Sequence, residues 1–340
     1  MPLTPNATLA KLPRAPLAFL PTPITPLLQL SKLLGGPELF IKRDDQTGLA
    51  TGGNKTRKLE FLLGQAIHAG ADALITAGSL QSNHARQTAA AAAQHQLECH
   101  LILRTPDGRP PRQTPNGNLL LDHLLGAVLH WTDEPAPYNQ TITQVETELA
   151  ASGRRPYVIP YGGSSPVGIM GYAAAMLEYA AQAAALGAFD AHVIATSSGG
   201  TQAGMLLGAH LAGLGAGVRI LGISVDRSRD ALAADVATLA NEGAALLDLD
   251  WRIDAQNVAI DDSYLGGGYA VIGEPEREAI ALVARTEGLL LDPVYTGRAM
   301  AGLIDLIRRG EFRPGGRVLF WHTGGAPALF AFADELGLMA

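Results

Sequence analysis

The sequence predicts an α/β fold with mostly parallel sheets. Short apolar segments of β type alternate with alanine- and leucine-rich helical segments along the chain of 340 residues. The β-type segments are near-continuously apolar, as is typical of parallel strands that are buried on both faces. Alternation of such strands with helices is the pattern of open sheets that carry helices on their faces.

Each expected strand is bounded by glycine, proline or polar turn residues. The expected strands cover residues 38–44, 71–78, 98–104, 157–163, 191–198, 217–225 and 316–325. The helices expected from composition and period cover residues 56–70, 84–96, 171–187, 201–215 and 274–288. Residues 105–118, TPDGRPPRQTPNGN, interrupt the alternation and are expected to form a surface excursion.

Composition and charge argue against several classes of function. The 25 basic and 32 acidic residues give a net charge of −7, which argues against a nucleic-acid or anionic-membrane partner. No apolar run approaches the roughly 18 residues of a membrane span, and prolines break up the amino-terminal segment, so no signal peptide is expected. A cytoplasmic location follows as an expectation. The single cysteine, Cys99, excludes an internal disulfide, and the histidine spacing matches no metal motif.

Lysine is scarce in this sequence. Of the 25 basic residues only five are lysines, and all lie in the first 58 positions: Lys11, Lys32, Lys42, Lys55 and Lys58. An arginine stays protonated and is not a nucleophile, whereas a lysine amine can lose its proton and attack a carbonyl carbon. Arginine-favouring codon usage explains the low share of lysine equally well. The residues around each lysine must therefore show whether it has a chemical role.

The segment GLATGGNKTRKLEF, residues 48–61, places a lysine at the start of a helix. It misses the nucleotide-binding P-loop pattern because Asn54 stands between the second glycine and Lys55. The helix dipole and the neighbouring Arg57 and Lys58 are expected to lower the pKa of Lys55. A solvated lysine next to a glycine turn is the alternative explanation.

Two further loops between a strand and a helix are rich in polar groups. The segment ITAGSLQSNHARQ has more polar side chains than helix capping needs: Gln81, Ser82, Asn83 and His84. This excess indicates a small polar ligand. In TSSGGT, residues 196–201, small residues and hydroxyls precede a helix, which favours a phosphate monoester. Helix caps and a tight turn without ligand are the alternatives. Later loops contain Tyr295, Thr296 and Thr323, for which the residues alone favour structural roles, as a buried tyrosine and two helix caps.

A reactive lysine and a metal-free phosphate loop on one α/β fold are the requirements for binding pyridoxal 5'-phosphate. The segments TGGNKTRKLEFL, QSNHARQTAA, SSGGTQAG, LDPVYTGRAM and HTGGAPALF resemble motifs of the D-cysteine desulfhydrase / 1-aminocyclopropane-1-carboxylate deaminase family. These are fold-type II enzymes related to the tryptophan synthase β-subunit, and the resemblance extends over nearly the whole chain. It implies pyridoxal phosphate as cofactor, no metal, a small amino-acid substrate and a homodimer.

The same resemblance implies two open, twisted, mostly parallel sheets with the cofactor in the cleft between two domains. Residues 1–57 and 166–340 are expected to form the larger, cofactor-binding domain, and residues 58–165 the smaller α/β domain. Lys55 is expected to hold the cofactor as a Schiff base and to act as base. Asn83 would form a hydrogen bond with the ring hydroxyl, and Ser82 would bind the substrate carboxylate or assist proton transfer.

The family motifs assign the remaining site residues by position. The cofactor-binding set adds Asn54, Lys58, Ser197, Ser198, Gly199, Gly200, Thr201, Thr296 and Thr323. Gln81 and His84 join Ser82 and Asn83 in the substrate-binding set. Tyr295 and Tyr269 would flank the substrate; the stretch before Tyr269 lacks a proline that the family often has.

Two threonines favour one branch of the family. Cyclopropane deaminases typically have Glu after the tyrosine that matches Tyr295, and Leu at the position of Thr323, whereas this chain has Thr296 and Thr323. A hydroxyl beside the pyridine nitrogen leaves it largely neutral, which suffices for β-elimination. The sequence therefore predicts conversion of D-cysteine to pyruvate, hydrogen sulfide and ammonia. The alternatives are an L-cysteate sulfo-lyase, the cyclopropane deaminase, a non-catalytic sensor of pyridoxal phosphate or amino acids, and an NAD- or ATP-binding protein.

Overall fold

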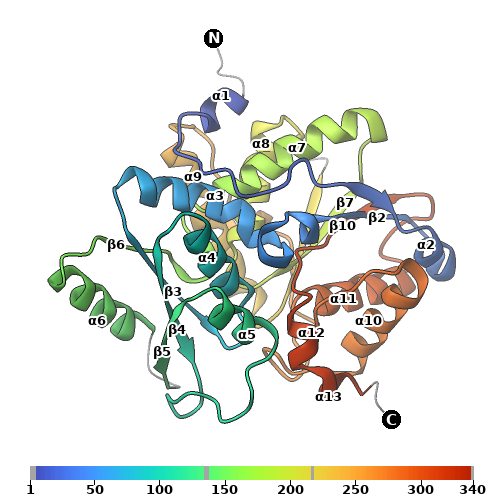
Figure 1. Cartoon of the computed structure of the whole chain (residues 1–340). Helices are drawn as coiled ribbons and strands as arrows, with labels where there is room; N and C mark the ends of the chain where they lie inside the picture. The colour runs from blue at the N-terminus through green and yellow to red at the C-terminus, as the bar shows by residue number, and fades with distance from the viewer. Residues whose placement is uncertain (1–4, 134–137, 216–217, 338–340) are drawn as a thin grey trace.

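The computed structural model describes residues 5–133, 138–215 and 218–337. In this part of the chain, helices cover two separate sheets (Figure 1). The larger sheet has six strands in the order β1-β2-β10-β7-β8-β9, and the smaller has four in the order β5-β4-β3-β6. All pairs of neighbouring strands are parallel except β1 with β2. The predicted α/β fold is confirmed.

The larger sheet is buried on both faces. Its strands are β1 (Ile24–Pro26), β2 (Glu38–Lys42), β7 (Ala191–Thr196), β8 (Arg219–Ser224), β9 (Ile260–Asp261) and β10 (Arg317–Trp321). The covering helices are α2 (Leu28–Leu34), α7 (Met170–Leu186), α8 (Gly200–Leu211), α10 (Glu274–Glu287) and α11 (Thr296–Arg308). Because side chains alternate along a strand, Val318 and Phe320 pack with α2, α10 and α11. Leu319 and Trp321 pack on the opposite face with α7 and α8.

The smaller sheet follows the same principle. Its strands are β3 (Ala73–Ser79), β4 (Glu98–Arg104), β5 (Val128–Thr132) and β6 (Pro156–Val158). The helices around it are α3 (Asn54–His68), α4 (Asn83–Gln94), α5 (Gly117–Leu124) and α6 (Tyr138–Ala151). Leu74 and Leu101 face α3, α4 and α5, whereas Ile75 and Ile102 face α6. Cys99 on β4 is buried and is a free cysteine.

The remaining elements are short or peripheral. They are α1 (Pro5–Leu9), α9 (Arg229–Leu246), α12 (Ala328–Ala331) and α13 (Ala333–Leu336), with the 3₁₀ turns η1 (Asp44–Gln46), η2 (Leu49–Thr51), η3 (Tyr161–Gly163) and η5 (Ala255–Asn257). The strand expected over residues 157–163 ends at Val158. It does not reach residue 163 because Pro160 has no N–H to donate, and Gly162 and Gly163 then adopt φ angles of 64° and 63° in the turn η3.

A buried network of charges joins β2, α3 and α7. The Arg57 guanidinium donates to Asp44 Oδ2 and to Glu178 Oε2, both at 2.9 Å. Lys42 pairs with the same Glu178, and the Tyr172 hydroxyl donates to Asp44. Removing one partner from such a network leaves a buried charge uncompensated, which costs several kcal/mol. The network therefore fixes the first turn of α3 against the larger sheet.

Two further expectations concern organisation and membranes. The larger sheet draws its strands from residues 24–42 and 191–321, and the smaller sheet from residues 73–158. The expected boundary between residues 57 and 58 falls inside α3, and the domain boundaries stay a prediction. Among the described residues, no helix is long and apolar enough to cross a membrane.

Candidate active site

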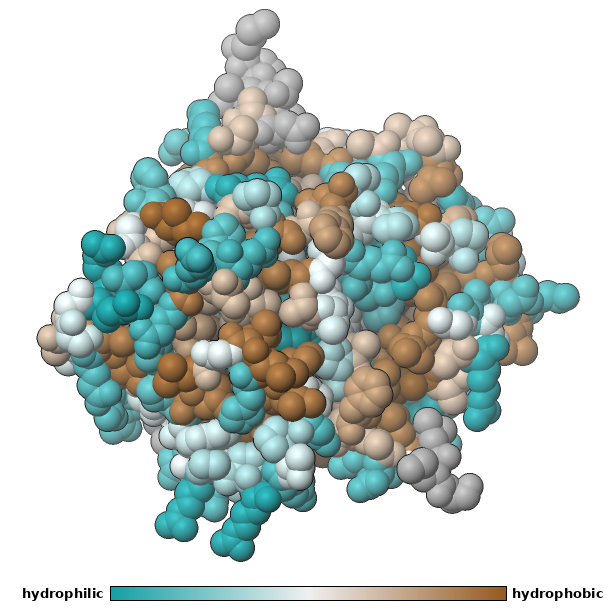
Figure 2. Space-filling view, in the orientation of Figure 1, coloured by the Kyte–Doolittle hydropathy of each residue, from teal (hydrophilic) through white to brown (hydrophobic). Residues whose placement is uncertain are grey.

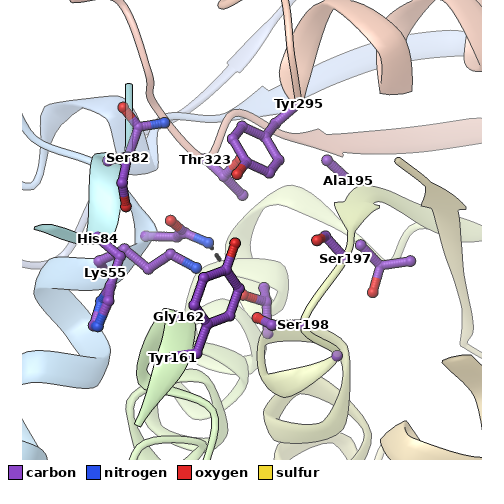
Figure 3. Close-up of a pocket in the computed structure, with 15 residues that line it drawn as sticks. Lys55, Ser82, His84, Tyr161, Gly162, Ala195, Ser197, Ser198, Tyr295 and Thr323 are labelled. Carbon is purple, nitrogen blue, oxygen red and sulfur yellow. Dashed lines mark hydrogen bonds between the residues drawn. The ribbon is translucent and has the colours of Figure 1, made fainter. Parts of the chain in front are cut away.

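A cavity opens where helices and strands from both sheets converge (Figure 3). It lies at the carboxyl ends of strands, where ligands bind in open α/β sheets. Its lining consists of Asn54, Lys55, Ser82, Asn83, His84, Tyr161, Gly162, Ala195, Thr196, Ser197, Ser198, Gly199, Thr201, Tyr295 and Thr323. Five of the loops that the sequence marks as polar therefore meet in one place: the turn before α3, the start of α4, the β7–α8 loop, the loop that contains Tyr295 and the loop after β10.

The turn before α3 holds Lys55 in this cavity. Gly53 has a φ of 130°, and a Cβ there would lie 2.4 Å from Gln87 Nε2, so only glycine fits. The next residue, Asn54, donates its backbone N–H to the Thr323 carbonyl oxygen at 3.0 Å. Its side-chain amide donates to Thr201 Oγ1 at 3.1 Å. The lysine turn is thus tied to two of the other loops.

Lys55 is half-buried, and its amine faces the cavity and bonds to no described group. Burial lowers the pKa of Lys55 to about 8, so about one amine in ten is unprotonated at pH 7. The pKa of Lys55 is lowered, as the sequence predicts, but burial lowers it and not the neighbouring charges. The expected neighbour Arg57 turns away into the network with Asp44 and Glu178.

The β7–α8 loop and Lys58 form a cradle for an anion. Gly199 takes the left-handed conformation, φ 77°, directly before α8, whose first N–H groups lack helical partners. Lys58 Nζ approaches from α3 and donates to the Gly162 carbonyl oxygen at 3.2 Å, with no carboxylate partner among the described residues. A Cβ on Gly200 would lie 2.9 Å from this Nζ. Burial and the charge of Lys55 lower the pKa of Lys58 well below its ordinary value.

The start of α4 presents three polar side chains to the cavity. Ser82 is the N-cap of α4, and its Oγ accepts a hydrogen bond from the Ala85 N–H at 3.1 Å. Ser82 therefore caps the helix, and it also lines the cavity. His84 Nε2 lies 2.9 Å from Thr76 Oγ1, which itself donates to the Ile159 carbonyl oxygen. The proton therefore sits on His84 Nε2. Its Nδ1 is buried without a partner in the described chain.

The first turn of α11 brings Tyr295 into the cavity. The Asp292 carboxylate accepts the backbone N–H groups of Val294, Tyr295 and Thr296 and caps the helix. Tyr295 Oη lies 2.7 Å from Tyr269 Oη, which lies 3.3 Å from Ser79 Oγ. Burial raises the pKa of Tyr295 well above 10, so this hydroxyl keeps its proton near neutrality.

Not every residue expected in the site lines the cavity. The Thr296 hydroxyl donates to Asp292 Oδ1 at 2.7 Å, and of the two diagnostic threonines only Thr323 belongs to the lining. Lys58, Gly200 and Tyr269 lie directly behind lining residues. Gln81 lies outside the lining and binds the backbone N–H of Asn118 at 2.8 Å.

Comparison with known proteins assigns this chain to a family. The model of the pyridoxal-phosphate dependent enzyme family matches residues 16–324. The chain is 45% identical over 325 residues to a D-cysteine desulfhydrase of Salmonella choleraesuis (strain SC-B67), covering 95% of this chain and 97% of the relative. It is 44% identical over 335 residues to one of Yersinia pestis (strain Pestoides F), covering 98% and 100%. This chain belongs to the pyridoxal-phosphate dependent enzyme family.

Solved structures agree with this assignment. An ACC deaminase homologue superposes with a TM-score of 0.89 at 40% identity, covering 99% of both chains. Threonine deaminase isoform 2 of Solanum lycopersicum superposes with a TM-score of 0.65 at 17% identity, covering 98% of this chain and 86% of that one, and shows the shared fold. The chain is a pyridoxal-phosphate dependent enzyme with the fold of these relatives.

The cavity fits the cofactor of the family. Pyridoxal phosphate carries an aldehyde, a phosphate and a pyridine ring, and needs a neutral amine and an anion site close together. Lys55 supplies an amine of lowered pKa, and the space that a Cβ on Gly200 would fill lies next to Lys58 Nζ and Ser164 Oγ. Thr196 Oγ1, at the end of β7, is buried without a partner in the described residues and lines the same cavity.

Two residues of this family member escaped the sequence-based expectations. Tyr161 lines the cavity and points its hydroxyl into it (Figure 3). The Gly-Gly pair after it was the available signal, since it ends the expected strand there. Asn118 belongs to the stretch expected to be a surface excursion. Most of residues 105–117 are exposed, but Asn118 is fully buried and contacts Asn83.

The buried Asp122, near Arg86, gives a prediction about stability. Burial raises the pKa of Asp122 from 3.8 to about 8, and its carboxylate accepts no hydrogen bond from the described residues. Between these two values the folded state binds one proton more than the unfolded state, so stability falls as the pH rises through this window. Asp122→Asn removes the ionisation, and we expect it to be more stable than the wild type above pH 8.

The stability difference is expected to depend on pH. It should shrink by about 1.4 kcal/mol per pH unit as the pH falls from about 8 toward 4. Chemical unfolding of both proteins from about pH 5 to about pH 9, followed by circular dichroism, measures it. A difference that stays constant with pH would contradict the assignment of this effect to the Asp122 carboxyl group.

Proposed function

We propose that this enzyme is a D-cysteine desulfhydrase. It converts D-cysteine and water to pyruvate, hydrogen sulfide and ammonia. The observation that carries the proposal is one cavity that holds the Lys55 amine, the anion cradle and the protonated Tyr295 hydroxyl. The two relatives described above, which are named D-cysteine desulfhydrase, support the choice of substrate.

Separate groups of residues are proposed to hold the parts of the cofactor. Lys55 would hold its aldehyde carbon covalently in the absence of substrate. Asn83 would form a hydrogen bond with the ring oxygen, and Thr323 with the ring nitrogen. Thr296 would support this end of the site indirectly, since its hydroxyl donates to Asp292. Ser197, Ser198, Gly199, Gly200 and Thr201 surround the phosphate together with Lys58, and Asn54 supports Thr201. When bound, pyridoxal phosphate withdraws electrons from the Cα atom of an attached amino acid.

The remaining chemistry is proton transfer by this chain's own side chains. Lys55, with its lowered pKa, accepts the proton from the substrate Cα. Ser82, with His84 beside it, binds the substrate carboxylate. The C–S bond then breaks, and Tyr295, supported by the Tyr269 hydroxyl, supplies a proton to the departing sulfur.

Substrate comparison tests the proposal. We expect purified enzyme to release pyruvate from D-cysteine and β-chloro-D-alanine. L-cysteate and 1-aminocyclopropane-1-carboxylate are assayed beside them, because a sulfo-lyase remains an alternative and a solved relative is an ACC deaminase homologue. Turnover of the cyclopropane alone would contradict the role given to Thr323 and Thr296. Binding without any turnover would identify a sensor instead.

Lys58 provides a test of the anion cradle. Lys58→Gln removes the amine that would face the phosphate while keeping a polar side chain, so affinity for pyridoxal phosphate should fall by about 10- to 100-fold. Affinity for pyridoxal, which has no phosphate, should change little. Equilibrium dialysis of both compounds measures this, with the exposed Lys32→Gln as a matched control. Equal losses for both compounds would argue against a phosphate contact at Lys58.

A cytoplasmic homodimer with two domains completes the proposal. An exposed apolar patch supports self-association: Leu120 and Leu124 on α5 and Phe330 on α12 are 43%, 72% and 72% exposed, and Figure 2 shows brown side chains on this face. A two-fold dimer would bury the same patch on both copies. Light scattering is expected to give twice the chain mass of 35.5 kDa. The division into 1–57 with 166–340 and 58–165 is supported by the separate sheets.

A further inference from the structure

Asn83 lines the cavity with one half of its amide group already occupied. Its Oδ1 accepts hydrogen bonds from Asn118 Nδ2 at 2.9 Å and from Arg86 Nη1 at 3.2 Å. Two bonds saturate an amide oxygen. The Nδ2 donor has no partner among the described groups, so it is left for whatever enters the cavity.

Arg86 fixes the orientation of both amides. A guanidinium only donates, so the atoms that Arg86 contacts on Asn83 and Asn118 must be oxygens. Its Nη1 lies 2.7 Å from Asn118 Oδ1, which directs Asn118 Nδ2 toward Asn83 Oδ1 and the Gln81 carbonyl oxygen. Arg86 and Asn118 are fully buried, so solvent does not compete for these bonds.

The same network reaches the lysine turn. Arg86 Nη2 and Gln87 Nε2 both donate to the Gly52 carbonyl oxygen at 2.8 Å. Gly52 lies three positions before Lys55. The network therefore links the backbone of the turn before Lys55 and the amide of Asn83 through a few buried hydrogen bonds.

We propose that Asn118 is a positioning residue that makes Asn83 an obligatory hydrogen-bond donor. Asn118 lies in the first turn of α5, directly after a mostly exposed stretch, and reaches Asn83 from there. It does not line the cavity itself. The site then selects an acceptor oxygen at this point. With the proposed function, on which this inference rests, that oxygen is the ring oxygen of pyridoxal phosphate, which the Asn83 donor stabilises in its ionised form.

Asn118→Asp tests the orientation with almost no change in volume. The Arg86 guanidinium keeps the new carboxylate ionised, although Asp122 and Asp292 also act on this arginine. A carboxylate cannot donate to Asn83 Oδ1 and repels it at close range, which outweighs the longer 3.2 Å bond from Arg86 Nη1, so the Asn83 amide should turn and present its oxygen to the cavity. We expect the pKa of the visible band of the bound cofactor to rise by about one to two units, and cofactor affinity to fall about tenfold or more.

A second variant separates orientation from packing. Asn118→Ala loses one bond to Asn83 but leaves Arg86 to hold its oxygen, so its pKa shift should be smaller than that of Asn118→Asp. A merely structural role predicts the opposite order, because alanine leaves a cavity and aspartate does not. Asn116→Asp, which adds the same charge at an exposed position of the same loop, is the control and should titrate like the wild type.

Spectrophotometric pH titration and cofactor binding by fluorescence give these results without an activity assay. A wild-type band pKa in Asn118→Asp overturns the positioning role, as does a larger shift in Asn118→Ala. If the wild type itself shows no visible band with pyridoxal phosphate, the proposed function fails instead, and the two failures are distinct. Should Asn118→Asp not fold, Asn118→Ala decides: a wild-type band pKa there, with cofactor affinity unchanged, also overturns the role.

Discussion

Replacement of Lys55 by arginine is expected to abolish both the visible band of bound cofactor and pyruvate release. Arginine keeps the positive charge and much of the length of lysine, but its guanidinium neither bonds to an aldehyde carbon nor accepts a proton near neutrality. Turnover should fall by at least about 10³-fold, because covalent binding and the base are lost together. Pyruvate assay and absorption spectroscopy measure the two effects on the same preparation.

The exposed Lys32 provides the matched control for this substitution. Lys32→Arg should keep the band and the turnover of the wild type. A Lys55→Arg protein that folds, as judged by circular dichroism, and still turns over D-cysteine with a visible band would place the covalent site on another lysine. The described cavity offers no second lysine in its lining.

Tyr295→Phe is expected to leave the cofactor bound and to slow turnover by about 10²- to 10⁴-fold. The tyrosine keeps its proton because burial raises its pKa well above 10, so it acts as a proton donor and not as a base. Phenylalanine preserves the ring packing and removes only the hydroxyl. The visible band should therefore persist while kcat falls, a combination that steady-state kinetics and spectroscopy detect together.

Tyr269→Phe tests the partner of this hydroxyl. Tyr269 Oη lies 2.7 Å from Tyr295 Oη but does not line the cavity, so its loss should reduce kcat less than Tyr295→Phe. β-Chloro-D-alanine sharpens the comparison, because chloride leaves without a proton. If Tyr295→Phe slows β-chloro-D-alanine as strongly as D-cysteine, proton donation to sulfur is not the role of Tyr295.

The sequence predicted what depends on local pattern. The turn before Lys55 directly precedes α3, and the hydroxyl loop directly precedes α8. Short-range geometry therefore determines both. Parallel topology then places the ends of β7 and β10 side by side. The meeting of these loops in one cavity follows from that topology.

The sequence did not predict what depends on distant contacts. The pKa of Lys55 falls through burial, which local charges do not reveal. Arg57 looked like a neighbour of this lysine, yet Glu178, far along the chain, draws it away. Asn118 looked like a loop residue because its bonds to Arg86 and Asn83 span more than 30 positions. Such roles require the assembled fold.

The free cysteine has a consequence for an enzyme that handles thiols. Cys99 is the single cysteine of the chain and is 5% exposed on β4, and burial, with the charge of Asp122, raises the pKa of its thiol. Only an accessible thiolate exchanges with disulfides or is oxidised toward a persulfide. The proposed substrate and the sulfide released from it thus meet no reactive sulfur on the protein.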